Sequence, residues 1–94
     1  MNISQACADG LYDRIDAADR LYGDFQSTHE ALGVAVEEWQ ELGDEIRAND
    51  PEKIKRECLD LAAVLIRLHD QIDSSQRRKA RSFAKAVKPV APRG

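Results

Sequence analysis

The sequence predicts an all-α fold, with a helical hairpin core and flanking helices, on three observations. The composition, 43% hydrophobic and 33% charged, suits a helical globular protein and argues against general disorder. Apolar residues recur every three or four positions through long stretches. Helix start and stop signals separate those stretches. Because 94 residues bury only a modest core, we expect residues 1–87 to form one domain that assembles into a four-helix-bundle-type oligomer.

The first helix is expected over residues 3 to 21, where apolar side chains form a single stripe. That stripe consists of Ile3, Cys7, Leu11, Ile15, Ala18 and Tyr22. Gly23 and Asp24 interrupt the pattern. Ser27 and Glu30 then have the spacing of a capping box, in which the serine caps a new helix. The second helix is therefore predicted to begin there and to run to about Ala48.

The second helix carries an apolar face that we expect to lie in the core. Its members are Leu32, Ala35, Val36, Trp39, Leu42 and Ile46. Residues 49–52, Asn-Asp-Pro-Glu, are typical of a helix end followed at once by a new start, because Asp50 can cap and Pro51 suits the first helical position. So short a connection predicts an antiparallel hairpin.

The third helix is expected from Pro51 to about Asp73, and a fourth from Ser74 to Val87. Residues 88–94 contain two prolines and are expected to form a flexible basic tail. The third helix is apolar on several sides, which indicates neighbours from a second subunit and favours a homodimer or homotetramer.

Several features predict a soluble protein of the reducing cytoplasm, with no membrane partner. Cys7 and Cys58 lie on apolar sides of predicted helices and are expected to be small buried thiols. The N-terminal residues do not have the basic flank and apolar run of a signal peptide. The longest uninterrupted apolar run, residues 61–66, is too short to cross a bilayer.

Charge is distributed unevenly. Residues 1–73 hold all 17 acidic residues and 7 of the 14 basic ones, a balance of −10, and residues 74–94 hold the other 7 bases. The basic end could contact nucleic acid or a phosphate-bearing ligand, or it could pair with the acidic body of its own or a neighbouring chain. Both alternatives stay open.

Two acidic pairs, Glu38 with Glu41 and Glu57 with Asp60, dominate the chain. Each pair is spaced i, i+3, so both carboxylates lie on one side of a helix. Glu57 also falls inside the apolar stripe of its helix, where an ionised carboxylate is costly unless it is compensated. Four carboxylates without a companion histidine or thiolate suit a hard cation, so we expect Mg²⁺, with Mn²⁺ as a substitute.

These residues resemble those of the MazG-like all-α nucleoside triphosphate pyrophosphohydrolases. Residues 37–41, Glu-Glu-Trp-Gln-Glu, followed after 15 residues by 57–60, Glu-Cys-Leu-Asp, match the family pattern EExxE…ExxD. The flanking stretches, 29–45 and 61–67, are also similar to short bacterial and phage members. The resemblance covers about residues 22–73. It departs at Arg56 and Leu59, where many members have an acid and a glycine.

The resemblance implies a chemistry and a set of residues. Glu38, Glu41, Glu57 and Asp60 would hold Mg²⁺, and a nucleoside triphosphate would be cleaved between its α and β phosphates to a monophosphate and pyrophosphate. Bound Mg²⁺ would neutralise the phosphates and activate the attacking water. Glu41 or Glu37 would take the proton of that water. The expected purpose is the removal of surplus or unwanted nucleotides.

Substrate contacts are harder to predict. Phe25, with Tyr22 and His29, clusters where the second helix begins and could stack on a nucleobase. Lys53, Arg67 or the basic residues near Arg78 could contact phosphate, although solvation is the simpler role for Lys53 and Arg67. The alternative function is a non-enzymatic helical interaction module whose basic end contacts nucleic acid, a partner that the enzyme hypothesis does not need.

Overall fold

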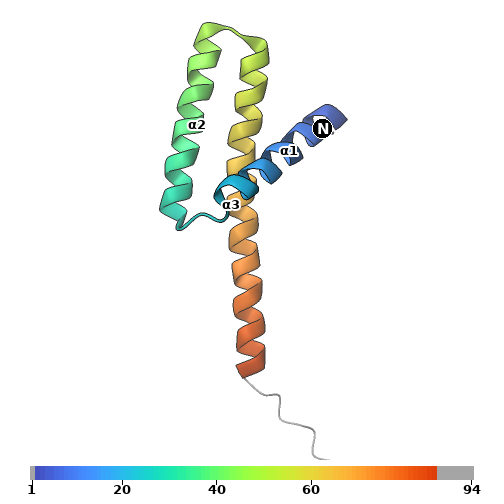
Figure 1. Cartoon of the computed structure of the whole chain (residues 1–94), viewed down its shortest axis with the longest axis vertical. Helices are drawn as coiled ribbons and strands as arrows, with labels where there is room; N and C mark the ends of the chain where they lie inside the picture. Colours follow the sequence, from blue (N-terminus) through green and yellow to red (C-terminus); the bar gives the residue numbers. More distant parts are fainter. Residues whose placement is uncertain (1, 87–94) are drawn as a thin grey trace, which may run out of the picture.

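The computed structural model describes residues 2–86 as three helices without a strand. The helices are α1 (Gln5–Tyr22), α2 (Thr28–Ala48) and α3 (Pro51–Ala86). Figure 1 shows α2 and α3 as an antiparallel hairpin and α1 crossing α3 obliquely. α3 packs against both other helices. The all-α prediction is confirmed for these residues, and the tail predicted at 88–94 lies outside them.

Side-chain caps fix the starts of α1 and α2. The Ser4 hydroxyl accepts a hydrogen bond from the Cys7 backbone N–H at 3.1 Å. The Ser27 hydroxyl accepts one from the Glu30 backbone N–H at 3.1 Å, which confirms the predicted start of the second helix. α1 ends at Gly23, whose φ of 66° is a conformation that favours glycine.

The hairpin turn follows the predicted stop and restart. Asn49 takes the left-handed conformation at φ 63° and caps the end of α2. The Asp50 carboxylate accepts a hydrogen bond from the Lys53 backbone N–H at 3.2 Å, and Pro51 is the first residue of α3. Two residues therefore reverse the chain, and α2 lies along the first part of α3 (Figure 1).

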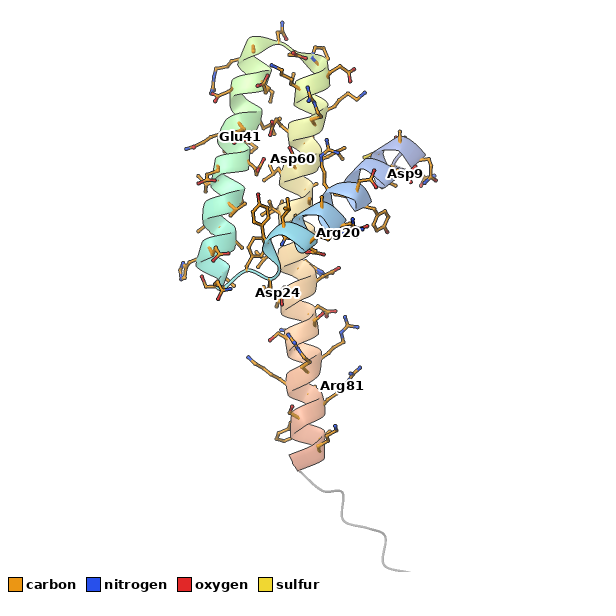
Figure 2. The ribbon with its side chains drawn as sticks, viewed as in Figure 1. Asp9, Arg20, Asp24, Glu41, Asp60 and Arg81 are labelled. Atoms are coloured by element: carbon orange, nitrogen blue, oxygen red, sulfur yellow. The ribbon has the colours of Figure 1, made fainter. Side chains whose placement is uncertain are left out.

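The predicted break at Ser74 is wrong, because α3 continues as one helix to Ala86. No glycine or proline occurs between Pro51 and Pro89, so nothing in the backbone forces an end there. The ion pair between Arg77 Nη2 and Asp73 Oδ2, at 2.8 Å, bridges the expected junction. The last third of α3 extends beyond the hairpin, where Arg81 is drawn in Figure 2.

The core is small and lies where the loop after α1 meets the hairpin. Phe25, Ala31 and Val64 form its centre, with Val34, Ala35 and Leu68 packed against them. The Phe25 backbone N–H donates to Gln71 Oε1 at 2.8 Å, and Gln71 Nε2 donates to the Phe25 carbonyl at 2.7 Å. This pair of bonds fastens the loop to α3.

Two core predictions are wrong. Trp39 is 65% exposed, and Leu32, Val36 and Ile46 of the same predicted face are exposed as well, whereas Leu42 and Ala35 of that face do lie in the core. The reason is that the apolar residues of α2 cover a wide part of its circumference, and the edge with Ala31 and Leu42 turns toward α3 while the edge with Trp39 turns away. Cys58 is exposed rather than buried, and Cys7 is half-buried; both are free thiols.

Within residues 2–86, none of the helices is both long and apolar enough to span a lipid bilayer.

Candidate metal centre

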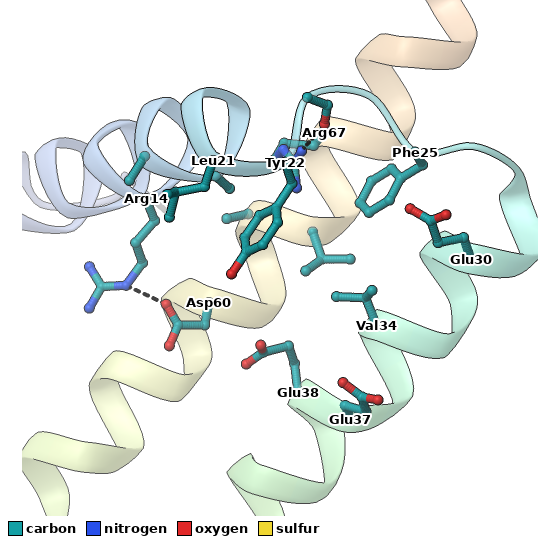
Figure 3. Close-up of a pocket in the computed structure, with 15 residues that line it drawn as sticks. Arg14, Leu21, Tyr22, Phe25, Glu30, Val34, Glu37, Glu38, Asp60 and Arg67 are labelled. Atoms are coloured by element: carbon teal, nitrogen blue, oxygen red, sulfur yellow. Dashed lines mark hydrogen bonds and ion pairs between the residues drawn. The ribbon is translucent and has the colours of Figure 1, made fainter.

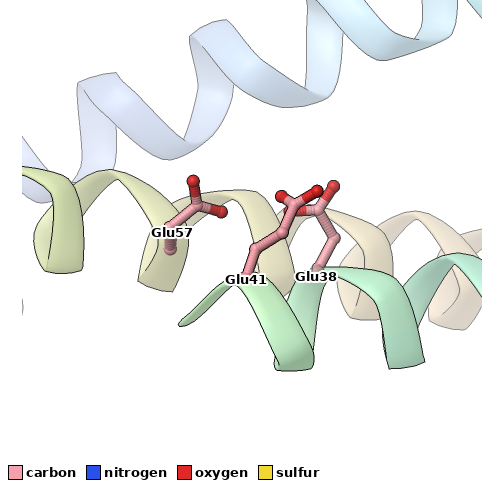
Figure 4. Close-up of side chains that lie close together, drawn as sticks. All are labelled: Glu38, Glu41 and Glu57. Atoms are coloured by element: carbon pink, nitrogen blue, oxygen red, sulfur yellow. The ribbon is translucent and has the colours of Figure 1, made fainter. Parts of the chain in front are cut away.

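Three predicted ligands converge halfway along the hairpin. Glu38 and Glu41 come from successive turns of α2, and Glu57 comes from the facing turn of α3. One carboxylate oxygen of each lies within 4.8 Å of the others. Figure 4 shows the three side chains directed toward one another. Three carboxylates at this separation form a set of hard oxygen donors of the kind that Mg²⁺ prefers.

Two of these carboxylates each bury one oxygen that has no hydrogen-bond partner among the described residues. Oε2 of Glu38 and Oε2 of Glu57 are shielded from solvent, and neither has a hydrogen-bond partner in the part of the chain that the structure describes. A buried polar atom without a partner destabilises the fold, and more so when it carries charge. The donor set and these two oxygens therefore fit a divalent cation.

The pKa values of Glu38 and Glu57 are both raised, first by burial and then by neighbouring carboxylates. Burial raises the pKa of Glu38 from 4.5 to about 7, and the charges of Glu41, Asp60 and Glu57 contribute in that order. Burial is likewise the first cause of the raised pKa of Glu57, followed by the charges of Glu41 and Asp60. A cation would reverse this balance, since it stabilises the ionised forms.

Asp60, the fourth predicted ligand, is engaged elsewhere. Its Oδ1 accepts a hydrogen bond and ion pair from Arg14 Nε of α1 at 2.7 Å. Asp60 is near enough to contribute to the Glu38 pKa, but it does not belong to the group within 4.8 Å. Sequence reasoning missed Arg14, although the signal was present: the arginine stands three residues after Leu11, inside the apolar stripe of the first helix.

A cavity of about 550 Å³ adjoins the acidic cluster between α1, the following loop and the hairpin. Figure 3 shows its lining, which combines aromatic and aliphatic side chains with charged groups on several sides, Glu37, Glu38 and Asp60 among them. The residues that matter for its chemistry are Arg14, Tyr22, Val34, Glu37, Glu38, Asp60, Val64 and Arg67. Its volume and mixed lining suit a flat polar ligand next to the carboxylates.

Arg67 fixes one wall of this cavity and is not a solvated surface residue. Its side chain is only 7% exposed. Nε binds Asp19 Oδ1 at 2.8 Å, Nη2 donates to the Gly23 carbonyl at 2.6 Å, and the guanidinium lies 4.8 Å from the centre of the Phe25 ring. Arg67 therefore anchors the end of α1 to α3.

Of the residues predicted to contact substrate, some line the cavity and others lie outside it. Phe25 lines the cavity but is only 7% exposed, so its ring belongs to the core more than to a stacking surface. Tyr22, by contrast, is 77% exposed and lines the same cavity. His29, Lys53 and Arg78 are exposed residues outside the cavity lining.

Comparison of the chain with protein-family models, with curated proteins and with solved structures finds no match.

Proposed function

We propose that this protein is a Mg²⁺-dependent nucleoside triphosphate pyrophosphohydrolase that releases a monophosphate and pyrophosphate. The observation that carries the proposal is the pair of buried, unpartnered oxygens on Glu38 and Glu57, which converge with Glu41 beside a cavity, among residues 2–86. Keeping these carboxylates together without a cation is unfavourable, and a bound divalent cation would compensate their charge.

Each residue has a defined task in this proposal. Glu38, Glu41 and Glu57 hold the cation, and Asp60 completes the set. Mg²⁺, when bound, neutralises phosphate charge and lowers the pKa of the attacking water. Glu37 lines the cavity outside the cluster of three carboxylates, so it is better placed than Glu41 to accept the proton of that water.

The lining of the cavity favours a nucleotide as the substrate, in preference to a smaller phosphate compound. Tyr22 and Val34 provide apolar surface on which a base or sugar can pack, while Glu38 and Asp60 line the cavity beside the acidic cluster. A ligand that spans both regions places its phosphates against the carboxylate cluster and its base between α1 and the hairpin. Nucleoside triphosphates have this shape.

The assembly we propose is a homodimer, or a tetramer built from dimers, in which hairpins pair into a four-helix bundle. The exposed α2 residues Leu32, Val36, Trp39 and Ile46 are spaced by four, three and seven, as in a coiled-coil seam. At about 100° per residue they lie opposite the cavity-lining Glu37. Leu65 and Ile72 of α3 are exposed on the matching side. A second copy would cover this two-helix face.

The test of the activity is the release of pyrophosphate from a panel of canonical and modified triphosphates, with and without Mg²⁺. Glu38→Gln and Glu57→Gln should each abolish release while the helical circular dichroism signal is kept. Glu52→Gln is the matched control, because that exposed glutamate at the start of α3 lies away from the cluster. Full activity in either cluster variant would contradict the assignment.

A nucleic-acid-binding module is the second candidate, and the projecting end of α3 favours it. Residues 74–86 contain five basic residues and no acid. Arg77, Arg78, Arg81 and Lys85 fall within about 100° of the helix circumference, so they form one basic strip. Binding of DNA or RNA that weakens steeply with salt, and that needs no Mg²⁺, would support this function. No binding at low salt would remove it.

A further inference from the structure

Arg14 connects α1 to the acidic cluster through a single carboxylate. Its Nε donates to Asp60 Oδ1 at 2.7 Å (Figure 3). Its Nη1 donates to the Gly10 carbonyl, one turn earlier in α1, at 3.2 Å. The side chains of Arg14 and Asp60 are 26% and 38% exposed, so the pair is partly shielded from water. Both residues line the cavity.

We infer that Arg14 is an exchangeable positioning residue: it holds Asp60 away from the cluster in the cation-free chain and transfers to the substrate's phosphate when the site is loaded. The inference rests on the proposed function and deepens it. Its basis is that Asp60 is the one predicted ligand outside the 4.8 Å group and also the one that carries an ion pair to another helix.

Electrostatics gives the exchange a direction. A guanidinium at 2.7 Å from Asp60 and a divalent cation on the same carboxylate repel each other, so the two compete for it. Removing the arginine charge should therefore strengthen binding of the cation alone. The rival role for Arg14 is to orient Asp60 toward the cation. In that case, removal of the arginine would weaken cation binding instead.

The cavity explains where the released guanidinium goes. Arg14 lines the cavity together with Glu38 and Asp60. A polyphosphate beside the cluster offers this guanidinium charge-assisted hydrogen bonds that replace the one given up by Asp60. The same substitution that strengthens cation binding should thus weaken binding of a triphosphate.

Calorimetry on the full chain tests both expected changes, the stronger binding of the cation and the weaker binding of the triphosphate. Mn²⁺ alone, and then a non-hydrolysable triphosphate analogue with Mg²⁺, would be titrated into wild type, Arg14→Gln and Arg14→Lys. Arg20→Gln is the control, because Arg20 is exposed on the same helix and does not line the cavity. In Arg14→Gln we expect Mn²⁺ to bind several-fold more tightly and the analogue about tenfold more weakly. Lysine should restore part of the analogue affinity.

A double-mutant cycle separates exchange from a structural effect. In an Asp60→Asn background, Arg14→Gln should no longer strengthen Mn²⁺ binding, because the competing pair is already gone. Unchanged or weaker Mn²⁺ binding in Arg14→Gln would overturn the exchange and leave the proposed function standing. Absence of Mn²⁺ binding in the wild-type chain would overturn the proposed function and this inference together. If Arg14→Gln fails to fold, Arg14→Met, which also removes the positive charge, takes its place in both titrations.

Discussion

Glu38 on α2 and Glu57 on α3 approach within 4.8 Å across the hairpin, and each buries one oxygen that meets no donor in the described part of the chain. Burial, followed by the charges of Glu41 and Asp60, raises the pKa of both carboxyls. The fold therefore carries a local destabilisation that either protons or a cation can relieve. This relationship sets how the stability of the protein should respond to pH and to metal.

The first prediction concerns pH in the absence of divalent cations. Because the pKa of Glu38 rises from 4.5 to about 7 on folding, the folded chain holds this proton more tightly than the unfolded chain does. The resulting stabilisation is complete below the unfolded value and is lost as pH rises through the folded value. In thermal melts with a chelator present, the melting temperature of Glu38→Gln should fall less with rising pH than that of wild type. Equal slopes between about pH 5 and pH 8 would contradict the assignment of the effect to Glu38.

The second prediction concerns metal. A cation that binds only the folded chain stabilises it by roughly 2.7 kcal/mol when its free concentration is about 100 times Kd. Mg²⁺ or Mn²⁺ should therefore raise the melting temperature of wild type at neutral pH. Glu38→Gln and Glu57→Gln should lose most of that increase, while Glu52→Gln keeps it. Sodium chloride at matched ionic strength distinguishes specific binding from screening, because screening would change the melting temperature of all variants alike.

Local signals in the sequence predicted the starts of the helices and the hairpin turn, because each depends on residues within one turn. Ser27 caps α2 through the Glu30 N–H, and Asp50 caps α3 through the Lys53 N–H. The meeting of Glu38 with Glu57 followed from those boundaries. Once the turn is placed, the antiparallel hairpin determines which turns of its two helices face each other.

Long-range relationships could not be predicted in this way. Apolar periodicity marks a strip on α2 but does not decide whether Trp39 or the adjacent Leu42 turns toward α3. The Arg14–Asp60 pair joins residues 46 positions apart, and only the crossing of α1 over α3 brings them together. At Ser74 the error was different: serine is common at helix starts, but it also continues a helix that no proline or glycine interrupts.

The third prediction concerns the two hydrogen bonds between Gln71 and Phe25. Replacing Gln71 with alanine leaves the Phe25 N–H and carbonyl without their side-chain partner in a partly buried position. We expect a loss of about 1–3 kcal/mol in the free energy of unfolding, measured by urea denaturation. Gln76→Ala, an exposed glutamine further along α3, is the control and should change stability little. Equal small effects would mean that the loop is held by other contacts.

The fourth prediction concerns the exposed two-helix face. Trp39 is 65% exposed in the single chain, and Tyr12 of α1 is exposed to the same degree at 67%. If a second copy covers the hairpin face opposite the cavity, Trp39→Glu places a charge in that interface and should reduce the mass measured by sedimentation to that of one chain. Tyr12→Glu should leave the assembly intact. The two variants differ only in which face receives the charge, so dissociation of both, or of neither, would rule out pairing through Trp39.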